Sequence, residues 1–154
     1  MQPEANSQTT SQALLDTLAQ SLETMAFVML DPVDGPQALP EDTIVASMTF
    51  AGPTSGRIDI AAPRAFAMML AANVLGTDPA DIDAIEKADD VMKELVNVVG
   101  GALMPHLAAS PEDVFKLAIP TLSNVDEVQW SAFSSDSAAQ VVMADGHVLA
   151  ARIV

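Results

Sequence analysis

Four residues of types that could act together on a partner molecule repeat at helical spacing within residues 90–104. They are Asp90, Glu94, Asn97 and Gly101. Their spacings of four, three and four residues place them within roughly 60° of one another on a helix. A carboxylate and a carboxamide one turn apart can reach into a bound partner together, and a glycine leaves room for a second backbone. This stripe is a candidate functional surface.

The other side of the same helix is apolar. Its residues are Val91, Met92, Leu95, Val96, Val98, Val99, Ala102 and Leu103. Such a helix buries its apolar side in a core and exposes its polar side. A solvated helix front is the alternative interpretation of the stripe, because Asp, Glu and Lys are ordinary on exposed helices. Asn97 favours a function, since asparagine has a poor helix propensity.

Composition excludes several classes of function. The 154-residue chain has 21 acidic and 6 basic residues, a formal net charge of −15, which opposes binding to nucleic acid or to an anionic membrane. The absence of cysteine removes disulfides, thiol nucleophiles and cysteine-ligated metals. His106 and His147 have no metal-ligand spacing. We therefore expect no metal ion or cofactor to be held by this chain itself.

The balance of apolar and charged residues predicts a folded, soluble protein. Half of the residues are hydrophobic and 18% are charged, and the length suits one domain. Residues 1–10 are polar, carry no secretory signal, and are interpreted as a disordered lead-in. The most apolar run, at 65–75, is too short to cross a bilayer. We expect a cytoplasmic protein with a single domain over residues 11–154.

Hydrophobic periodicity predicts helices in three parts of the chain. The first begins at Ser11, a candidate N-cap, and ends near residue 30, before Pro32. The second begins at Pro63 and ends at Gly76. The third carries the stripe, and Pro105 ends or kinks it.

Alternating apolar residues predict strands. They cover residues 43–50, 57–61, 139–143 and 148–154, with shorter strands at 115–119 and 128–132. Turn residues at 52–56 and 145–146 join two hairpins. Phe115, Leu117 and Ile119 are expected to share one face of their strand. This order predicts an α+β fold, a mostly antiparallel sheet with two long helices packed on one face.

The stripe extends into a longer spaced pattern. Three residues separate Asp90 from Glu94, and two separate Glu94 from Asn97. Pro120 follows Asn97 after twenty-two intervening residues. The pattern resembles the active-site signature of the CheC, CheX and FliY family of chemotaxis phosphatases. The order of elements over residues 11–154 is similar to that of the family as well.

The first helix carries an incomplete copy of the signature. Glu23 occupies a position like that of Glu94, but Ala26 stands where an asparagine would follow. With one complete signature the chain is most similar to CheX, a single-site member that pairs as a homodimer through its sheet. The resemblance therefore implies a CheX-like fold and the possibility of a homodimer.

The resemblance implies a phosphatase that removes the aspartyl phosphate from a CheY-like response regulator, in chemotaxis or two-component signalling. Asn97 would orient the attacking water and Glu94 would pair with the lysine of the receiver domain. Asp90, Gly101 and Pro120 would support the site, and the receiver would supply the Mg²⁺ ion. A non-catalytic receiver-binding adaptor and a structural dimer module are the alternatives.

Overall fold

The computed structural model describes residues 3–33 and 35–154. Its elements in chain order are α1 (Pro3–Ala26), β1 (Leu30–Pro32), β2 (Thr43–Ala51), β3 (Gly56–Pro63), α2 (Arg64–Leu75), α3 (Ile82–Leu107), β4 (Lys116–Leu117), β5 (Thr121–Asn124), α4 (Glu127–Ser134), β6 (Gln140–Ala144) and β7 (His147–Ile153).

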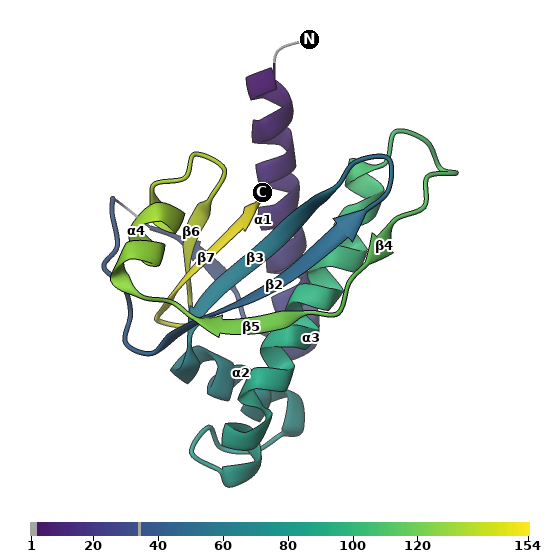
Figure 1. Cartoon of the computed structure of the whole chain (residues 1–154). Coiled ribbons are helices and arrows are strands. Elements are labelled where there is room, and N and C mark those ends of the chain that lie inside the picture. Colours follow the sequence, from purple (N-terminus) through teal and green to yellow (C-terminus); the bar gives the residue numbers. More distant parts are fainter. Residues whose placement is uncertain (1–2, 34) are drawn as a thin grey trace.

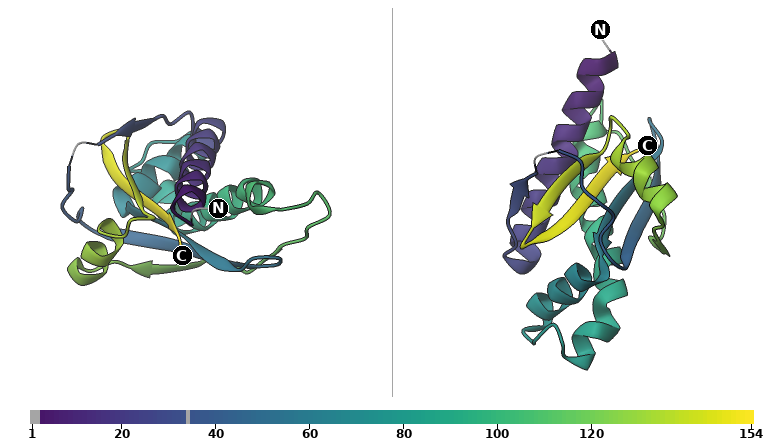
Figure 2. Two further views of the ribbon diagram at one scale, coloured as in Figure 1. Left: turned by 90° about the horizontal axis from the view of Figure 1, so that it is seen from above. Right: turned by 90° about the vertical axis from the view of Figure 1, so that its left-hand side faces the viewer.

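The strands form an antiparallel sheet in the order β1-β6-β7-β3-β2-β4, with β5 also pairing with β2 (Figure 1). Helices α1, α2 and α3 cover one face of this sheet, and α4 lies toward the other (Figure 2). The predicted α+β fold with two long helices on one face is confirmed. None of the helices formed by the described residues is both long enough and apolar enough to span a bilayer.

The main core lies between the sheet and the long helices. Helix α1 contributes Leu14, Leu18 and Leu22, which repeat every four residues and are fully buried. A smaller apolar cluster holds α4 against the opposite face, where Trp130 and Phe133 pack on β3 and β7. The indole of Trp130 donates a hydrogen bond to the carbonyl of Gln37 at 3.0 Å, so its polar atom is satisfied.

Both predicted hairpins are present, because their turn chemistry is local. β2 pairs with β3 and β6 pairs with β7. Asp145 and Gly146 adopt φ values of 50° and 83°, the positive values that a two-residue hairpin turn of this type requires. β1 was not predicted; it pairs with β6 at the edge of the sheet, where Pro32 is tolerated.

Helix α1 begins earlier than the sequence predicts. It starts at Pro3, a residue that suits the first turn of a helix, so Ser11 lies inside the helix and is not its N-cap. Residues 3–10 are helical where a disordered lead-in was expected, since each residue added to an existing helix gains a backbone hydrogen bond. Residues 1 and 2 lie outside the described part of the chain.

The strand predicted at residues 128–132 is wrong, because this segment is helix α4. Asp126 caps it by accepting a hydrogen bond from the backbone of Gln129, and the Gln129 side chain accepts one from the backbone of Asp126. This reciprocal pair is a capping box. It fixes a helix start more strongly than the short alternation of apolar residues favours a strand.

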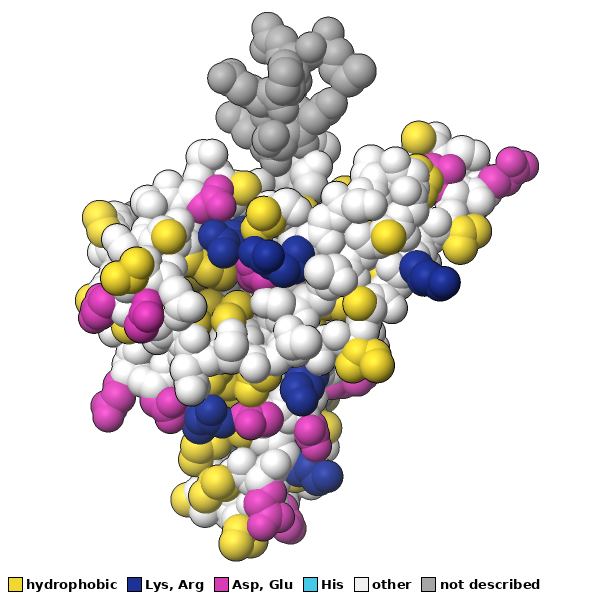
Figure 3. Space-filling model, viewed as in Figure 1, with side chains coloured by type: hydrophobic (Ala, Val, Ile, Leu, Met, Phe, Trp, Pro, Cys, Tyr) yellow, Lys and Arg dark blue, Asp and Glu magenta, His cyan; other side chains and the backbone are white. Residues whose placement is uncertain are grey.

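A buried carboxylate holds together the sheet face opposite α1 and α3. Asp59 of β3 is 2% exposed and accepts hydrogen bonds from Ser47 at 2.6 Å, Arg57 at 2.9 Å and Arg152 at 3.0 Å. Basic side chains gather over this part of the sheet (Figure 3). Burial raises the pKa of Asp59, but the hydrogen bonds from Arg57, Ser47 and Arg152 outweigh it and hold the pKa below its ordinary value.

Replacing Asp59 with asparagine is expected to lower the free energy of unfolding at pH 7 by about 2 kcal/mol. The loss stays below that of a wholly buried pair because the Arg57 side chain is 42% exposed. A lowered pKa stabilises the fold above the unfolded-state pKa of about 3.9, and this contribution disappears as the pH falls through the folded-state value. Urea unfolding at several pH values should therefore show the two proteins converging in acid. Equal stability at pH 7 would contradict this role of Asp59.

Candidate active site

Helix α3 positions the predicted stripe. Asp81 caps the helix by accepting a hydrogen bond from the backbone of Asp83, and a continuous apolar side fixes the rotation of the helix against the core. The buried residues of α3 are Ala84, Ala88, Val91, Met92, Leu95, Val96, Val99, Gly100, Leu103 and Met104. The exposed positions include Asp90, Glu94, Asn97 and Gly101. The predicted polar front is exposed, and six of the eight residues predicted for the apolar back are buried. The other two lie at the margin of the apolar side: Val98 is half-buried and Ala102 is exposed.

The stripe forms one wall of a shallow groove of about 340 Å³. Its lining residues are Asp90, Lys93, Glu94 and Asn97 from α3, facing Leu117, Ala118, Ile119 and Pro120 from the edge of the sheet. Four of the five predicted site residues thus surround one groove, although twenty-two residues separate Pro120 from Asn97 in the sequence. Lys93 of α3, which is not one of the predicted site residues, lines the groove as well.

An irregularity in the edge strand creates the second wall. β4 pairs Leu117 with Phe50 of β2. β5 then pairs Thr121 with Ser47 of the same strand. Three residues of the edge therefore stand opposite only two residues of β2. One extra residue of this kind is a β-bulge, which bends a strand and re-aims its side chains.

Proline suits this bulge, because it has no N–H to donate to a strand pairing. Pro120 and its neighbour Ile119 both line the groove beside α3. Ile119 is 88% exposed, whereas Leu117, which was expected to share its face, packs against the core. The sequence prediction of one continuous strand over 115–119 is wrong for this reason; only Lys116–Leu117 forms β4.

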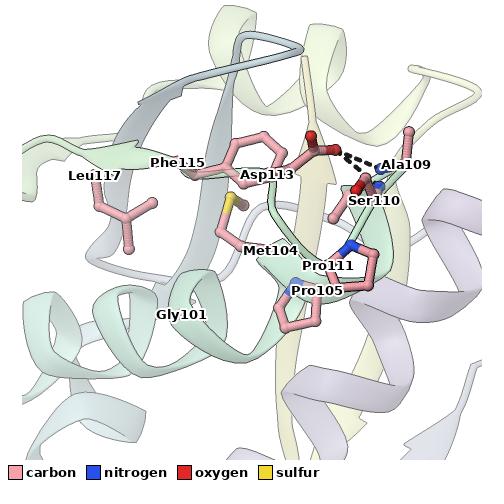
Figure 4. Close-up of a pocket in the computed structure, with 10 residues that line it drawn as sticks. Gly101, Met104, Pro105, Ala109, Ser110, Pro111, Asp113, Phe115 and Leu117 are labelled. Atoms are coloured by element: carbon pink, nitrogen blue, oxygen red, sulfur yellow. Dashed lines mark hydrogen bonds between the residues drawn. The ribbon is translucent and has the colours of Figure 1, made fainter.

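Gly101 lies one turn beyond Asn97 and opens toward a neighbouring cavity. A Cβ atom added at Gly101 would meet nothing within 4 Å. The cavity, about 570 Å³, lies between the end of α3 and the loop that leads to β4 (Figure 4). Leu117 lines both the cavity and the groove. The two hollows therefore share a wall along α3.

The close contact of this helix with the sheet is at the preceding residue, Gly100. A Cβ atom added at Gly100 would come within 2.0 Å of the terminal methyl of Met48. Gly100 thus leaves room for the flexible end of the Met48 side chain from β2, while Gly101 leaves the outer surface free. Pro105 lies inside α3, which continues for two more residues to Leu107. The helix therefore ends within its last turn, shortly after this proline, and not at it.

The polar side chains of the groove are available to a partner. Among the described residues, none forms a hydrogen bond or ion pair with the side chain of Glu94 or Asn97. Asp90 has a weak contact with Lys87, at 3.9 Å. Within the same part of the chain, no group of three or more His, Asp or Glu residues is arranged to hold a metal ion. The groove therefore offers carboxylates and a carboxamide to a partner molecule.

Lys93, Leu117, Ala118 and Ile119 line the groove but were not predicted as parts of the site. A local signal was available for one of them. Pro120 directly follows Ile119, and a proline within a sheet is confined to edge strands, strand starts and bulges. The position of Lys93 in the groove depends on how closely the edge approaches α3, which no local pattern specifies.

The site that the structure defines is an open groove on the longest helix of an α+β domain, lined by exposed carboxylates and a carboxamide. The family model described as chemotaxis phosphatase CheX matches residues 44–143, which is more than half of the chain. The chain belongs to the CheX family of chemotaxis phosphatases. The predicted family and the predicted enzyme class are thereby confirmed.

Solved structures of related proteins have the same fold. A putative chemotaxis protein of Desulfovibrio vulgaris Hildenborough has a TM-score of 0.69 at 17% identity, over 94% of this chain and 95% of that chain. CheX in the CheX–CheY–BeF₃–Mg²⁺ complex of Borrelia burgdorferi gives 0.66 at 21% identity, over 93% and 95%. FliY of Thermotoga maritima gives 0.62 at 10% identity, over 100% and 91%. No curated protein matches the sequence.

Proposed function

We propose that this chain removes the phosphoryl group from the phosphoaspartate of a CheY-like receiver domain, with Glu94 and Asn97 as its catalytic residues. The observation that carries the proposal is the groove, in which both side chains are exposed and unpartnered among the described residues. The CheX relative from Borrelia burgdorferi was solved with CheY, BeF₃ and Mg²⁺, which supports a receiver partner.

No covalent bond to the phosphatase is formed in this reaction. The oxygen of a water molecule attacks phosphorus, the bond between phosphorus and the aspartate oxygen breaks, and the products are a free carboxylate, inorganic phosphate and a proton. Positioning and charge stabilisation supply most of the catalysis in phosphoryl transfer. A rigid helix that carries two polar side chains one turn apart can provide this positioning.

Asn97 is suited to orient the attacking water. Its carboxamide has an acceptor oxygen and two donor hydrogens, and it does not titrate. The amide oxygen accepts a hydrogen bond from the water, and this contact directs a lone pair of the water oxygen at the phosphorus atom. Because the amide holds the water only in the attacking geometry, its contribution appears mainly in the transition state.

Glu94 is suited to fix the docking register. Its carboxylate pairs with the active-site lysine of the receiver, a charge-assisted contact that fixes how the two surfaces align. Asp90, Gly101 and Pro120 have supporting roles: Asp90 adds negative charge along the stripe, Gly101 keeps the surface open, and Pro120 shapes the facing wall. The Mg²⁺ ion belongs to the receiver, and this chain contributes no ligand to it.

We also propose that residues 11–154 act as a single domain in the cytoplasm.

We further propose that two copies of the chain pair through the sheet. The edges of the sheet are β1 on one side and β4 with β5 on the other. Exposed edge strands present backbone groups that can pair with a second chain. Sedimentation velocity at several concentrations measures whether this pairing occurs.

Turnover at low protein concentration tests the proposed function. A phosphorylated receiver domain from the same genome is mixed with this chain, and the chain is present at a small fraction of the receiver concentration. The release of inorganic phosphate is then followed. An enzyme accelerates the release of many equivalents of phosphate. A non-catalytic adaptor binds saturably and leaves the rate of phosphate loss unchanged, and that result with every receiver bound would contradict the proposal.

A further inference from the structure

Ile119 is a large apolar side chain on the rim of the groove. It is 88% exposed and lines the groove together with Glu94 and Asn97. Single exposed apolar residues are common on protein surfaces. This one differs because it lies beside the candidate catalytic residues, in a segment whose pairing irregularity turns it out of the core.

The backbone holds Ile119 firmly in this position. The N–H of Ala118 donates a hydrogen bond to the carbonyl of Thr49 at 2.9 Å. Thr121 resumes the pairing with β2 immediately after Pro120, and the proline ring restricts its own φ angle. A side chain presented from such a fixed segment loses little conformational freedom when a partner covers it.

The charges around Ile119 suit a receiver in its phosphorylated state. Asp90 and Glu94 place two carboxylates along one wall, with Lys93 between them. The phosphorylation site of a receiver carries a lysine and a Mg²⁺ ion, which complement those carboxylates. An apolar contact at the rim excludes water from such polar pairs and strengthens them.

We propose that Ile119 is an apolar docking residue that a phosphorylated receiver domain buries next to its phosphoaspartate. The proposal rests on the function proposed above. It assigns affinity for the receiver to a residue that takes no part in the reaction. Burial of this side chain contributes equally to the ground state and the transition state, so it lowers KM and leaves kcat unchanged.

The test compares Ile119→Ala with Val128→Ala, a matched change at an apolar side chain that is 78% exposed on α4 and lies outside the groove. The probe is a CheY-type receiver domain loaded with beryllofluoride and Mg²⁺, and its Kd is measured by titration calorimetry. Ile119→Ala is expected to weaken binding about tenfold, the equivalent of about 1.4 kcal/mol, with kcat on the phosphorylated receiver unchanged. Ile119→Leu should restore most of the affinity.

The outcomes separate this proposal from the function on which it rests. If wild type releases phosphate with turnover but Ile119→Ala binds as tightly as Val128→Ala, the docking role is wrong and the function stands. If the wild type binds a receiver without turnover and Ile119→Ala weakens that binding, the docking role stands and the phosphatase does not. Absence of binding to any receiver by the wild type would overturn both.

Discussion

Asn97→Ala is expected to lower kcat for phosphate release by about 100-fold, a loss typical of removing a positioning group. The affinity for the receiver should change far less, because the amide orients a water molecule that has its full effect in the transition state. Steady-state release of inorganic phosphate gives kcat, and titration with a beryllofluoride-loaded receiver gives Kd.

Asn97→Gln is a useful companion variant, since it keeps the amide and moves it by one methylene. A similar loss in this variant would indicate that the position of the amide matters, and not merely its polarity. Weakened docking with unchanged catalysis in the bound state would contradict the role assigned to Asn97.

Glu94→Ala is expected to weaken binding of the receiver by about 30-fold, or roughly 2 kcal/mol, because it leaves the lysine of the receiver without its partner. Glu86→Ala is the matched control: Glu86 is an exposed acid on the same helix and lies outside the groove. Affinity measured against ionic strength should show a weaker salt dependence for Glu94→Ala than for wild type. Equal losses of affinity in Glu94→Ala and Glu86→Ala would contradict a specific contact of Glu94, because each residue would then contribute only its negative charge.

Much of the fold follows from local patterns in the sequence. The stripe on α3 was predictable because the spacing of Asp90, Glu94 and Asn97 follows the helical period. The β6–β7 hairpin was predictable because Asp145 and Gly146 tolerate the positive φ values of its turn. Helix α4 could have been recognised from its capping box, since Asp126 and Gln129 have the required spacing.

The facing wall of the groove could not be derived in this way. The approach of Pro120 to Glu94 depends on the register of β4 and β5 against β2, which is a long-range property. The extra residue in that edge also reverses the expected orientation of Ile119. A pattern with a period of two predicts the side of a strand only while the pairing stays regular.

Phosphate loss inside the fully formed complex separates the role of Asn97 in the reaction from any role in docking. A receiver labelled with radioactive phosphate is mixed with a saturating excess of wild type or of Asn97→Ala, so that differences in affinity no longer affect the rate. We expect rapid first-order decay with wild type and decay about 100-fold slower with the variant. Equal decay rates in the two saturated complexes would contradict a catalytic role for Asn97.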